Sequence, residues 1–252
     1  MLRFIDCNCA VGLSVAAHDF LVCDPAEIER IERKCGIITA FAHHIASFDL
    51  HPIDGNLAID SVCAKNGFFH PVWVLIPNDT GEFYDPPLLM QLMKQRNVHM
   101  ARIFPRYNDH GFLLTEFCSG SLISALVEAG IPLLIDAEQT EWDMIHALMS
   151  DFPKLTLIVT NVYYRQGRIV LSLLKKHKNF YCETSGLRSF GLLQTFCESA
   201  SAEQLVFGTG MGLYSAGSAV AMIAYAGISW REKEAIAYGN LCRILEMDVY
   251  SF

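Results

Sequence analysis

Polar side chains that could do chemistry follow most of the short apolar runs in this sequence. They are Asn8, His43, Arg102, Asp136, Asn161 and Thr184, with Arg106 and Tyr163 close behind two of them. A carboxylate such as Asp136 can move a proton, and the amide of Asn161 can hold a reacting oxygen by a hydrogen bond. The guanidinium of Arg102 suits a carboxylate or a phosphate, because its planar fork donates two parallel hydrogen bonds. We therefore expect Asp136 and Asn161 to be catalytic, and the other six residues to bind a small-molecule substrate.

The elements that must position these residues form a repeated strand and helix pattern. The expected strands span residues 2–7, 36–42, 68–75, 100–104, 132–135, 155–160, 180–184 and 205–208. The expected helices span about 25–36, 54–66, 86–96, 117–129, 140–150, 165–177, 188–199, 215–226 and 229–246. Two helix starts carry capping signals, namely Asp24 before Pro25, and Ser229 followed by Glu232.

Strands and helices alternating in this number predict an α/β fold, a single-domain (β/α)8 TIM barrel over residues 1–252. An open doubly wound sheet is the competing fold, but no G-x-G-x-x-G motif follows the first strand. In barrels of this kind the active site lies at the carboxyl ends of the strands. The polar residues named above all follow predicted strands, so we expect them to meet at that face.

The composition excludes several classes of partner. The chain has 252 residues, 52% of them hydrophobic and 18% charged, with a net charge of −8. Without a cluster of Lys and Arg, the sequence argues against nucleic acid or an anionic membrane as a partner. An odd number of cysteines, nine, without framework spacing indicates free thiols and a cytoplasmic location. A homo-oligomer is expected.

Five stretches of the sequence resemble one family. They are IDCNCA (5–10), ARIFPRYNDHGF (101–112), NFYCETSGL (179–187), LVFGTGM (205–211) and EKEAIAYGNLCRIL (232–245). In this order they resemble the amidohydrolase-related family, which contains metal-dependent hydrolases and decarboxylases on (β/α)8 barrels. The resemblance spans the whole chain and implies a hydrolase.

The resemblance also implies where metal ligands would lie. The strand-1 histidines of the family correspond to Asn8 and Ala10, and the strand-5 and strand-6 histidines correspond to Asp136 and Asn161. The strand-8 aspartate corresponds to Gly210. Since none of these positions keeps the family residue, and a zinc site needs about three ligands, we expect a degenerate metal site and no cofactor.

Other metal sets stay open as alternatives. His43 or His44 with Asp136 and Asn8 could hold one divalent metal in a rearranged site. Cys7 and Cys9 are possible zinc ligands, but strand alternation predicts that both thiols point to the helix layer, away from Asn8 and Ala10. We therefore expect both cysteines to be core residues.

Three functions remain possible from the sequence. The first is a divergent hydrolase or lyase that binds a small carboxylated molecule and works without a metal. The second is a non-catalytic sensor of small molecules or a partner subunit, and the third is a metalloenzyme with the rearranged ligand set. A phosphate site at Gly208, Gly210 and Gly212 before the next helix is a further alternative.

Overall fold

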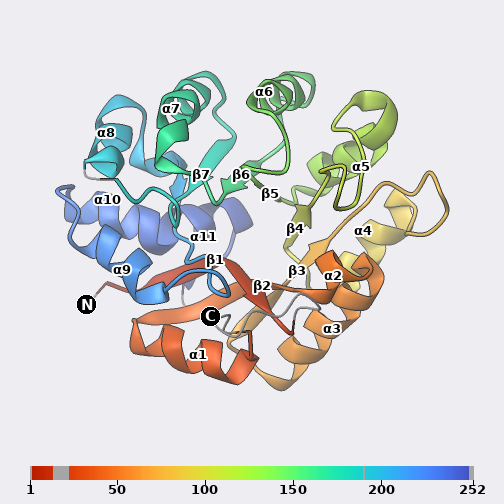
Figure 1. Ribbon diagram of the computed structural model, residues 1–252, viewed down its shortest axis with the longest axis horizontal. Helices are drawn as coiled ribbons and strands as arrows, with labels where there is room; N and C mark the ends of the chain where they lie inside the picture. The colour runs from red at the N-terminus through yellow and green to blue at the C-terminus, as the bar shows by residue number, and fades with distance from the viewer. Residues whose placement is uncertain (1, 14–22, 190, 250–252) are drawn as a thin grey trace.

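The computed structural model describes residues 2–13, 23–189 and 191–249. Eight parallel strands form one sheet in the order β1 to β8, with helices between them, which confirms the predicted barrel (Figure 1). The strands are β1 Phe4–Val11, β2 Ile37–His44, β3 Phe69–Val74, β4 Met100–Ile103, β5 Leu133–Asp136, β6 Leu157–Thr160, β7 Phe180–Glu183 and β8 Leu205–Val206. All eight overlap the predicted strands, and β1 and β2 extend beyond them.

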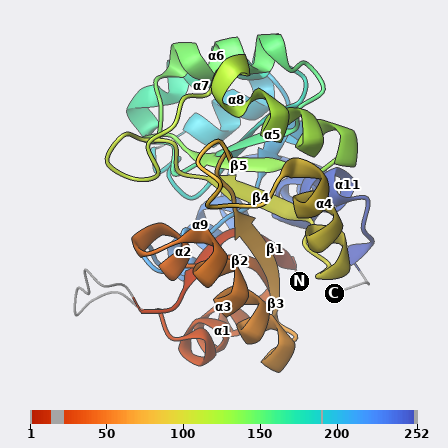
Figure 2. The same cartoon turned by 90° about the vertical axis from the view of Figure 1, so that its right-hand side faces the viewer.

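The helices lie outside the sheet, as the view from the side shows (Figure 2). The first six are α1 Pro25–Lys34, α2 Ala46–Asp49, α3 Pro52–Lys65, α4 Pro86–Gln95, α5 Glu116–Ala129 and α6 Trp142–Asp151. The others are α7 Gly167–Lys176, α8 Leu192–Ser199, α9 Ala216–Ala224, α10 Trp230–Glu234 and α11 Asn240–Leu245, with short 3-10 turns η1 Tyr164–Gln166 and η2 Ala202–Gln204. The sequence did not predict α2, which is a single turn.

The predicted helix starts are confirmed. Asp24 caps α1 by accepting a hydrogen bond from the backbone N–H of Glu27 at 3.0 Å. Ser229 and Glu232 form a capping box at the start of α10. The predicted helix 229–246 is interrupted, however, because a π-helical turn, Ala235–Gly239, lies between α10 and α11. The carbonyl of Ile236 in this turn accepts a hydrogen bond from Phe207 N at 3.0 Å, which ties the C-terminal helix to the end of β8.

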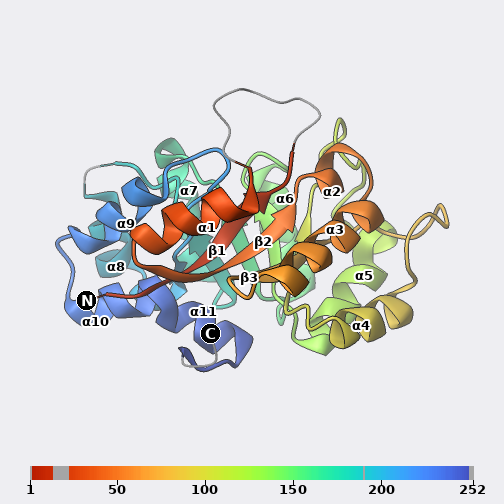
Figure 3. The ribbon, with the colours of Figure 1, turned by 90° about the horizontal axis from the view of Figure 1, so that it is seen from below.

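The barrel is nearly closed by the segment that follows β8. Beyond its two residues, backbone hydrogen bonds continue to β1: Cys7 N to Phe207 O at 3.1 Å, Gly210 N to Asn8 O at 2.9 Å, and Ala10 N to Met211 O at 3.0 Å. The view from below shows β1, β2 and β3 behind α1 and α3 (Figure 3). These bonds place Gly210 directly beside the carboxyl end of β1.

Two hydrophobic clusters divide the core. The inner cluster contains a residue from every strand: Ile5, Cys7, Phe41, Val72, Met100, Leu134, Ile158, Tyr181 and Val206. The outer cluster fills the space between the sheet and the helices and includes Cys9. Cys7 therefore lies inside the barrel, and the prediction that it faces the helix layer is wrong, whereas Cys9 does face the helices.

A bulge in β1 explains this difference. Asp6 pairs with Ala40 and Cys9 pairs with Ala42, so two residues of β1 oppose the single residue Phe41 of β2. A bulge of this kind interrupts the alternation of side chains. It lets both Cys7 and Asn8 face the barrel interior.

In the part of the chain that the structure describes, no helix combines the length and the apolar character that a membrane crossing requires.

Candidate functional site

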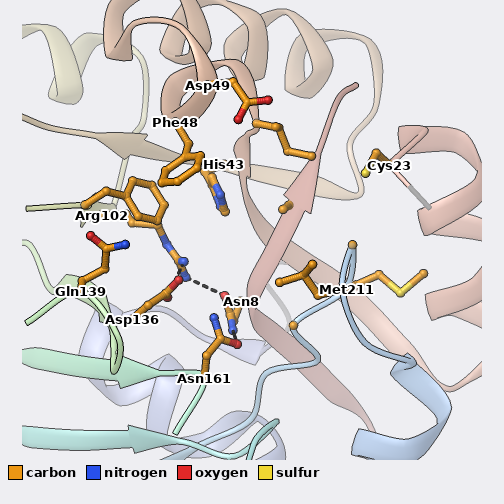
Figure 4. A pocket seen from close by; sticks show the side chains of 16 residues that line it. Asn8, Cys23, His43, Phe48, Asp49, Arg102, Asp136, Gln139, Asn161 and Met211 are labelled. Carbon is orange, nitrogen blue, oxygen red and sulfur yellow. Dashed lines mark hydrogen bonds and ion pairs between the residues drawn. The ribbon is translucent and has the colours of Figure 1, made fainter. Parts of the chain in front are cut away.

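A pocket of about 320 Å³ lies at the carboxyl ends of the strands (Figure 4). Five of the predicted site residues line it, namely Asn8, His43, Arg102, Asp136 and Asn161. Ala10 and Gly210 line it too, so all five positions that the resemblance pairs with metal ligands border one pocket. The prediction that these strand ends converge is therefore correct in its geometry.

Strand alternation explains how β4 and β5 aim their polar residues. Met100 and Leu134 belong to the inner cluster. The residues two positions further, Arg102 and Asp136, must face the same side, because side chains of a strand alternate. Each of these two strands thus contributes one residue to an apolar layer deep in the barrel and one residue to a polar layer at its mouth.

Arg102 lies at the centre of the polar layer. Its Nη1 donates to Asp136 Oδ1 at 2.9 Å, and its Nη2 donates to Asn8 Oδ1 at 2.6 Å (Figure 4). Its side chain is 2% exposed, and its guanidinium lies 5.7 Å from the centre of the Phe104 ring. Asp136 also accepts a hydrogen bond from the hydroxyl of Thr160. The guanidinium therefore connects β4 to β1 and β5.

Asn8 continues this network to the other side of the barrel. Its Nδ2 donates to Glu183 Oε2 at 3.1 Å and to Asn161 Oδ1 at 3.2 Å. Asn161 has a left-handed backbone conformation with φ of 55°, which asparagine tolerates better than most residues. Its backbone N–H donates to Glu183 Oε2 at 3.2 Å.

Glu183 is a functional candidate that the sequence reasoning left without a role. It is fully buried at the end of β7, where it also accepts hydrogen bonds from the backbone N–H and the hydroxyl of Ser185. Burial raises the pKa of Glu183 to about 7, although these donors oppose the shift. A Cβ atom at Gly208 would lie 2.6 Å from the Glu183 carboxylate, so the space for this acid depends on a glycine. The signal available in the sequence was an acid at the end of the predicted strand 180–184.

His43 enters the pocket as a neutral imidazole. Burial lowers its pKa well below the usual range, and the charge of Arg102 lowers it further. His44 lies elsewhere, with its Nδ1 accepting a hydrogen bond from Ala46 N at 3.1 Å beside the start of α2. Of these two histidines, His43 lines the pocket and His44 does not.

Apolar side chains form the outer wall of the pocket. They are Ala10, Ile45, Phe48, Phe104, Met211 and Leu213. The Phe48 and Phe104 rings meet edge to face with their centres 4.9 Å apart. The pocket thus has a mostly apolar wall above a polar floor, with Asp49 and Gln139 as further polar residues of its lining.

Three predicted site residues do not line this pocket. Arg106 is exposed and lines a separate surface hollow with Tyr107 and Gln139. Tyr163 is 50% exposed. Thr184 is buried behind the strand ends, where its backbone N–H donates to Val206 O at 3.0 Å. The structure therefore gives no contact between these side chains and the pocket.

The donors of the pocket do not fit a metal ion of the zinc or manganese type. Among the described residues, no three His, Cys, Asp or Glu side chains of its lining bring ligand atoms within 4.8 Å of one another. The group that meets this distance is Asp6, Cys9 and Glu32, on the helix side of β1. There, burial raises the pKa of Asp6, and burial together with the Asp6 charge raises the pKa of Glu32 well above its usual range. Protonation of one acid, which these raised pKa values favour, would reduce the repulsion between the two carboxyl groups.

Solved structures with this fold include proteins of known activity. The chain is similar to 2,6-dihydroxybenzoate decarboxylase from Rhizobium, with 13% identity, a TM-score of 0.73, and coverage of 98% of this chain and 99% of that chain. It is also similar to dihydroorotase from Campylobacter jejuni, with 14% identity, a TM-score of 0.67 and coverage of 98% and 84%. A third is 5-carboxyvanillate decarboxylase from Novosphingobium aromaticivorans, solved with manganese and 4-hydroxy-3-methoxy-5-nitrobenzoic acid, with 12% identity, a TM-score of 0.73 and coverage of 98% and 96%.

These structures cover nearly the whole chain with TM-scores of 0.67 to 0.73, so the (β/α)8 fold that the resemblance implies is confirmed. No family model matches the sequence, and no curated protein matches it either.

Proposed function

We propose that this barrel binds a small molecule with an apolar body and a carboxylate end in the pocket at its mouth. The observation that carries the proposal is the buried guanidinium of Arg102 on the floor of a pocket whose wall is apolar and aromatic. A mostly apolar cavity with a few convergent polar groups is typical of a small-molecule site, and 320 Å³ is at the small end of that class.

Free hydrogen-bonding groups support a carboxylate at the floor. Asn161 uses its Oδ1 to accept from Asn8, which leaves its Nδ2 group for a ligand oxygen. The Nε of Arg102 is a buried donor without a partner among the described residues. A buried donor without an acceptor costs about 1–3 kcal/mol, so an oxygen placed beside Arg102 would recover part of that energy.

The charges of the floor also constrain the ligand. Arg102 is balanced by Asp136, and a carboxylate would add one negative charge. Glu183 can compensate by taking up a proton, since its pKa is about 7. We therefore expect carboxylate affinity to fall as the pH rises above about 7.

The relatives in fold point to the same ligand class. Two of them are named as decarboxylases of aromatic carboxylates. An aromatic ring would pack against the wall that Phe48 and Phe104 form, with its carboxylate toward Arg102.

The catalytic roles belong to Asp136 and Asn161 in this proposal. Asp136 Oδ1 accepts from both Arg102 and Thr160, so Oδ2 is the atom left to exchange a proton with a ligand. Asn161 would orient the reacting group through its Nδ2.

The test is a calorimetric titration with benzoate, and with benzamide as its neutral analogue. We expect benzoate to bind more tightly than benzamide, Arg102→Ala to weaken benzoate binding by about tenfold or more, and Asn161→Asp to weaken it as well. The exposed Arg106→Ala is the matched control and should bind like the wild type. Equal binding of both compounds, or benzoate binding that ignores Arg102→Ala, would contradict the proposal.

A further inference from the structure

We propose that the guanidinium of Arg102 is the resident cation of this pocket and occupies the position between Asn8 and Asp136 that a metal ion would otherwise need. The inference goes beyond the proposed ligand class, because it concerns the charge that organises the pocket before any ligand binds.

The first observation is the position of the guanidinium. It bridges Asn8 and Asp136 at 2.6 and 2.9 Å; Asn8 lies within β1, and Asp136 is the last residue of β5. A cation that joins oxygens from separate strands does what a bound metal would do structurally. In this pocket the cation is the side chain of Arg102, which extends inward from β4 and is part of the chain itself.

The second observation is that Arg102 uses the oxygens a metal would need. Asp136 Oδ1 and Asn8 Oδ1 are both acceptors for the guanidinium. A divalent ion bound to the same oxygens would lie close to a buried positive charge, and such repulsion is strong inside a protein. The guanidinium and a metal at these oxygens are therefore mutually exclusive.

The third observation concerns the remaining positions around the mouth. Ala10 and Gly210 line the pocket but offer no side-chain donor. Gly210 has a φ of 62°, and a Cβ atom there would lie 2.6 Å from the Tyr214 ring. The pocket wall at this point is thus built around a residue without a side chain.

A fixed guanidinium limits the chemistry of the pocket. It can hold and polarise an oxygen through hydrogen bonds. It does not lower the pKa of a bound water to about 7, as catalytic zinc does. The pocket is therefore suited to holding an anionic or polar oxygen and not to making hydroxide.

The experiment replaces the side chain and then returns its charged group. Arg102→Ala should lower the melting temperature, because Asp136 loses its partner. Guanidinium chloride at about 20 mM, too dilute to denature appreciably, should raise the melting temperature of this variant. Urea at the same concentration is the neutral control of similar shape and should not. The wild type and Arg106→Ala should show no rise with either compound.

Metal analysis of the wild type provides a second measurement that needs no variant to fold. Protein purified without added metal or chelator should contain no stoichiometric zinc or manganese, and a chelator should not change its melting temperature. One equivalent of metal that Asp136→Asn removes would overturn the inference. An equal response of Arg102→Ala to urea and guanidinium would overturn it as well. Benzoate binding is not used in either measurement, so their failure is distinct from failure of the proposed ligand class.

Discussion

Asn8 connects the charges of the pocket at the scale of single residues. Its Oδ1 accepts from Arg102 while its Nδ2 donates to Glu183, so one amide separates a cation from a buried acid. An ionised aspartate at this position could accept from Arg102 but could not donate to Glu183. The network therefore depends on the Asn8 amide. Through its two hydrogen bonds, a change in the protonation of Glu183 should alter the interaction of Asn8 with Arg102.

The pH dependence of stability tests the assigned state of Glu183. Its pKa is raised from 4.5 to about 7 in the folded protein. Between these values the native state keeps a proton that the unfolded chain releases, so this acid makes the free energy of unfolding fall as the pH rises from about 4.5 to 7. The total effect is about 3 kcal/mol. The Glu183→Gln variant has no acid at this position, so its free energy of unfolding should lack this pH dependence.

Urea unfolding of both proteins at pH 5 and pH 8 measures the effect. The stability difference between the wild type and Glu183→Gln should change by about 3 kcal/mol between the two pH values. Using the difference removes the contributions of other buried groups, such as Asp6 and Glu32. A difference that stays constant would mean that Glu183 is ionised throughout this range.

At the scale of elements, the mouth is shaped where β1 meets the segment after β8. The bulge between Asp6 and Cys9 turns Asn8 inward. Asp6 accepts hydrogen bonds from the backbone N–H groups of Asn8 and Thr209, both at 2.9 Å, and so ties the bulge to the β8 segment. The polar network of the pocket thus rests on backbone geometry as well as on side chains.

The loop after β8 gives a prediction about the Gly210 position. Gly210→Asp restores the acid that the resemblance places there, yet φ of 62° and the nearby Tyr214 ring make any side chain unfavourable. We expect a loss of about 1–3 kcal/mol in stability and no metal-dependent hydrolysis, because the other four ligand positions remain altered.

Gly210→Ala is the matched control, since it carries the same backbone strain without a carboxylate. Melting temperatures and hydrolysis assays with and without manganese should give the same result for both variants. Metal-dependent turnover in Gly210→Asp alone would refute the expectation.

At the scale of the whole molecule, the barrel could be predicted because each strand and helix carries its own periodicity and boundary signals. The convergence of Arg102, Asp136 and Asn161 followed, since carboxyl ends of parallel strands meet at one face. The direction of the Cys7 side chain could not be predicted, because the bulge in β1 cannot be recognised from the order of residue types. The role of Glu183 was also hidden, because its burial and its partners come from β1 and β6, which are distant in sequence.

The positions of predicted site residues in loops could not be derived from strand alternation. Arg106 and Tyr163 lie in loops, where the direction of a side chain is set by local contacts and not by strand alternation. The structure places both outside the pocket. Thr184 directly follows β7 and also lies outside the pocket, so a position next to a strand end did not by itself predict a residue of the pocket lining.

The most direct test of this account is a crystal structure of protein prepared without added metal and soaked with benzoate, with anomalous data recorded for zinc and manganese. The account predicts the Arg102 guanidinium between Asn8 and Asp136, with a carboxylate at hydrogen-bond distance from Arg102 or Asn161. An anomalous peak between Asp136 and His43, with Arg102 turned away from both Asn8 and Asp136, would contradict it.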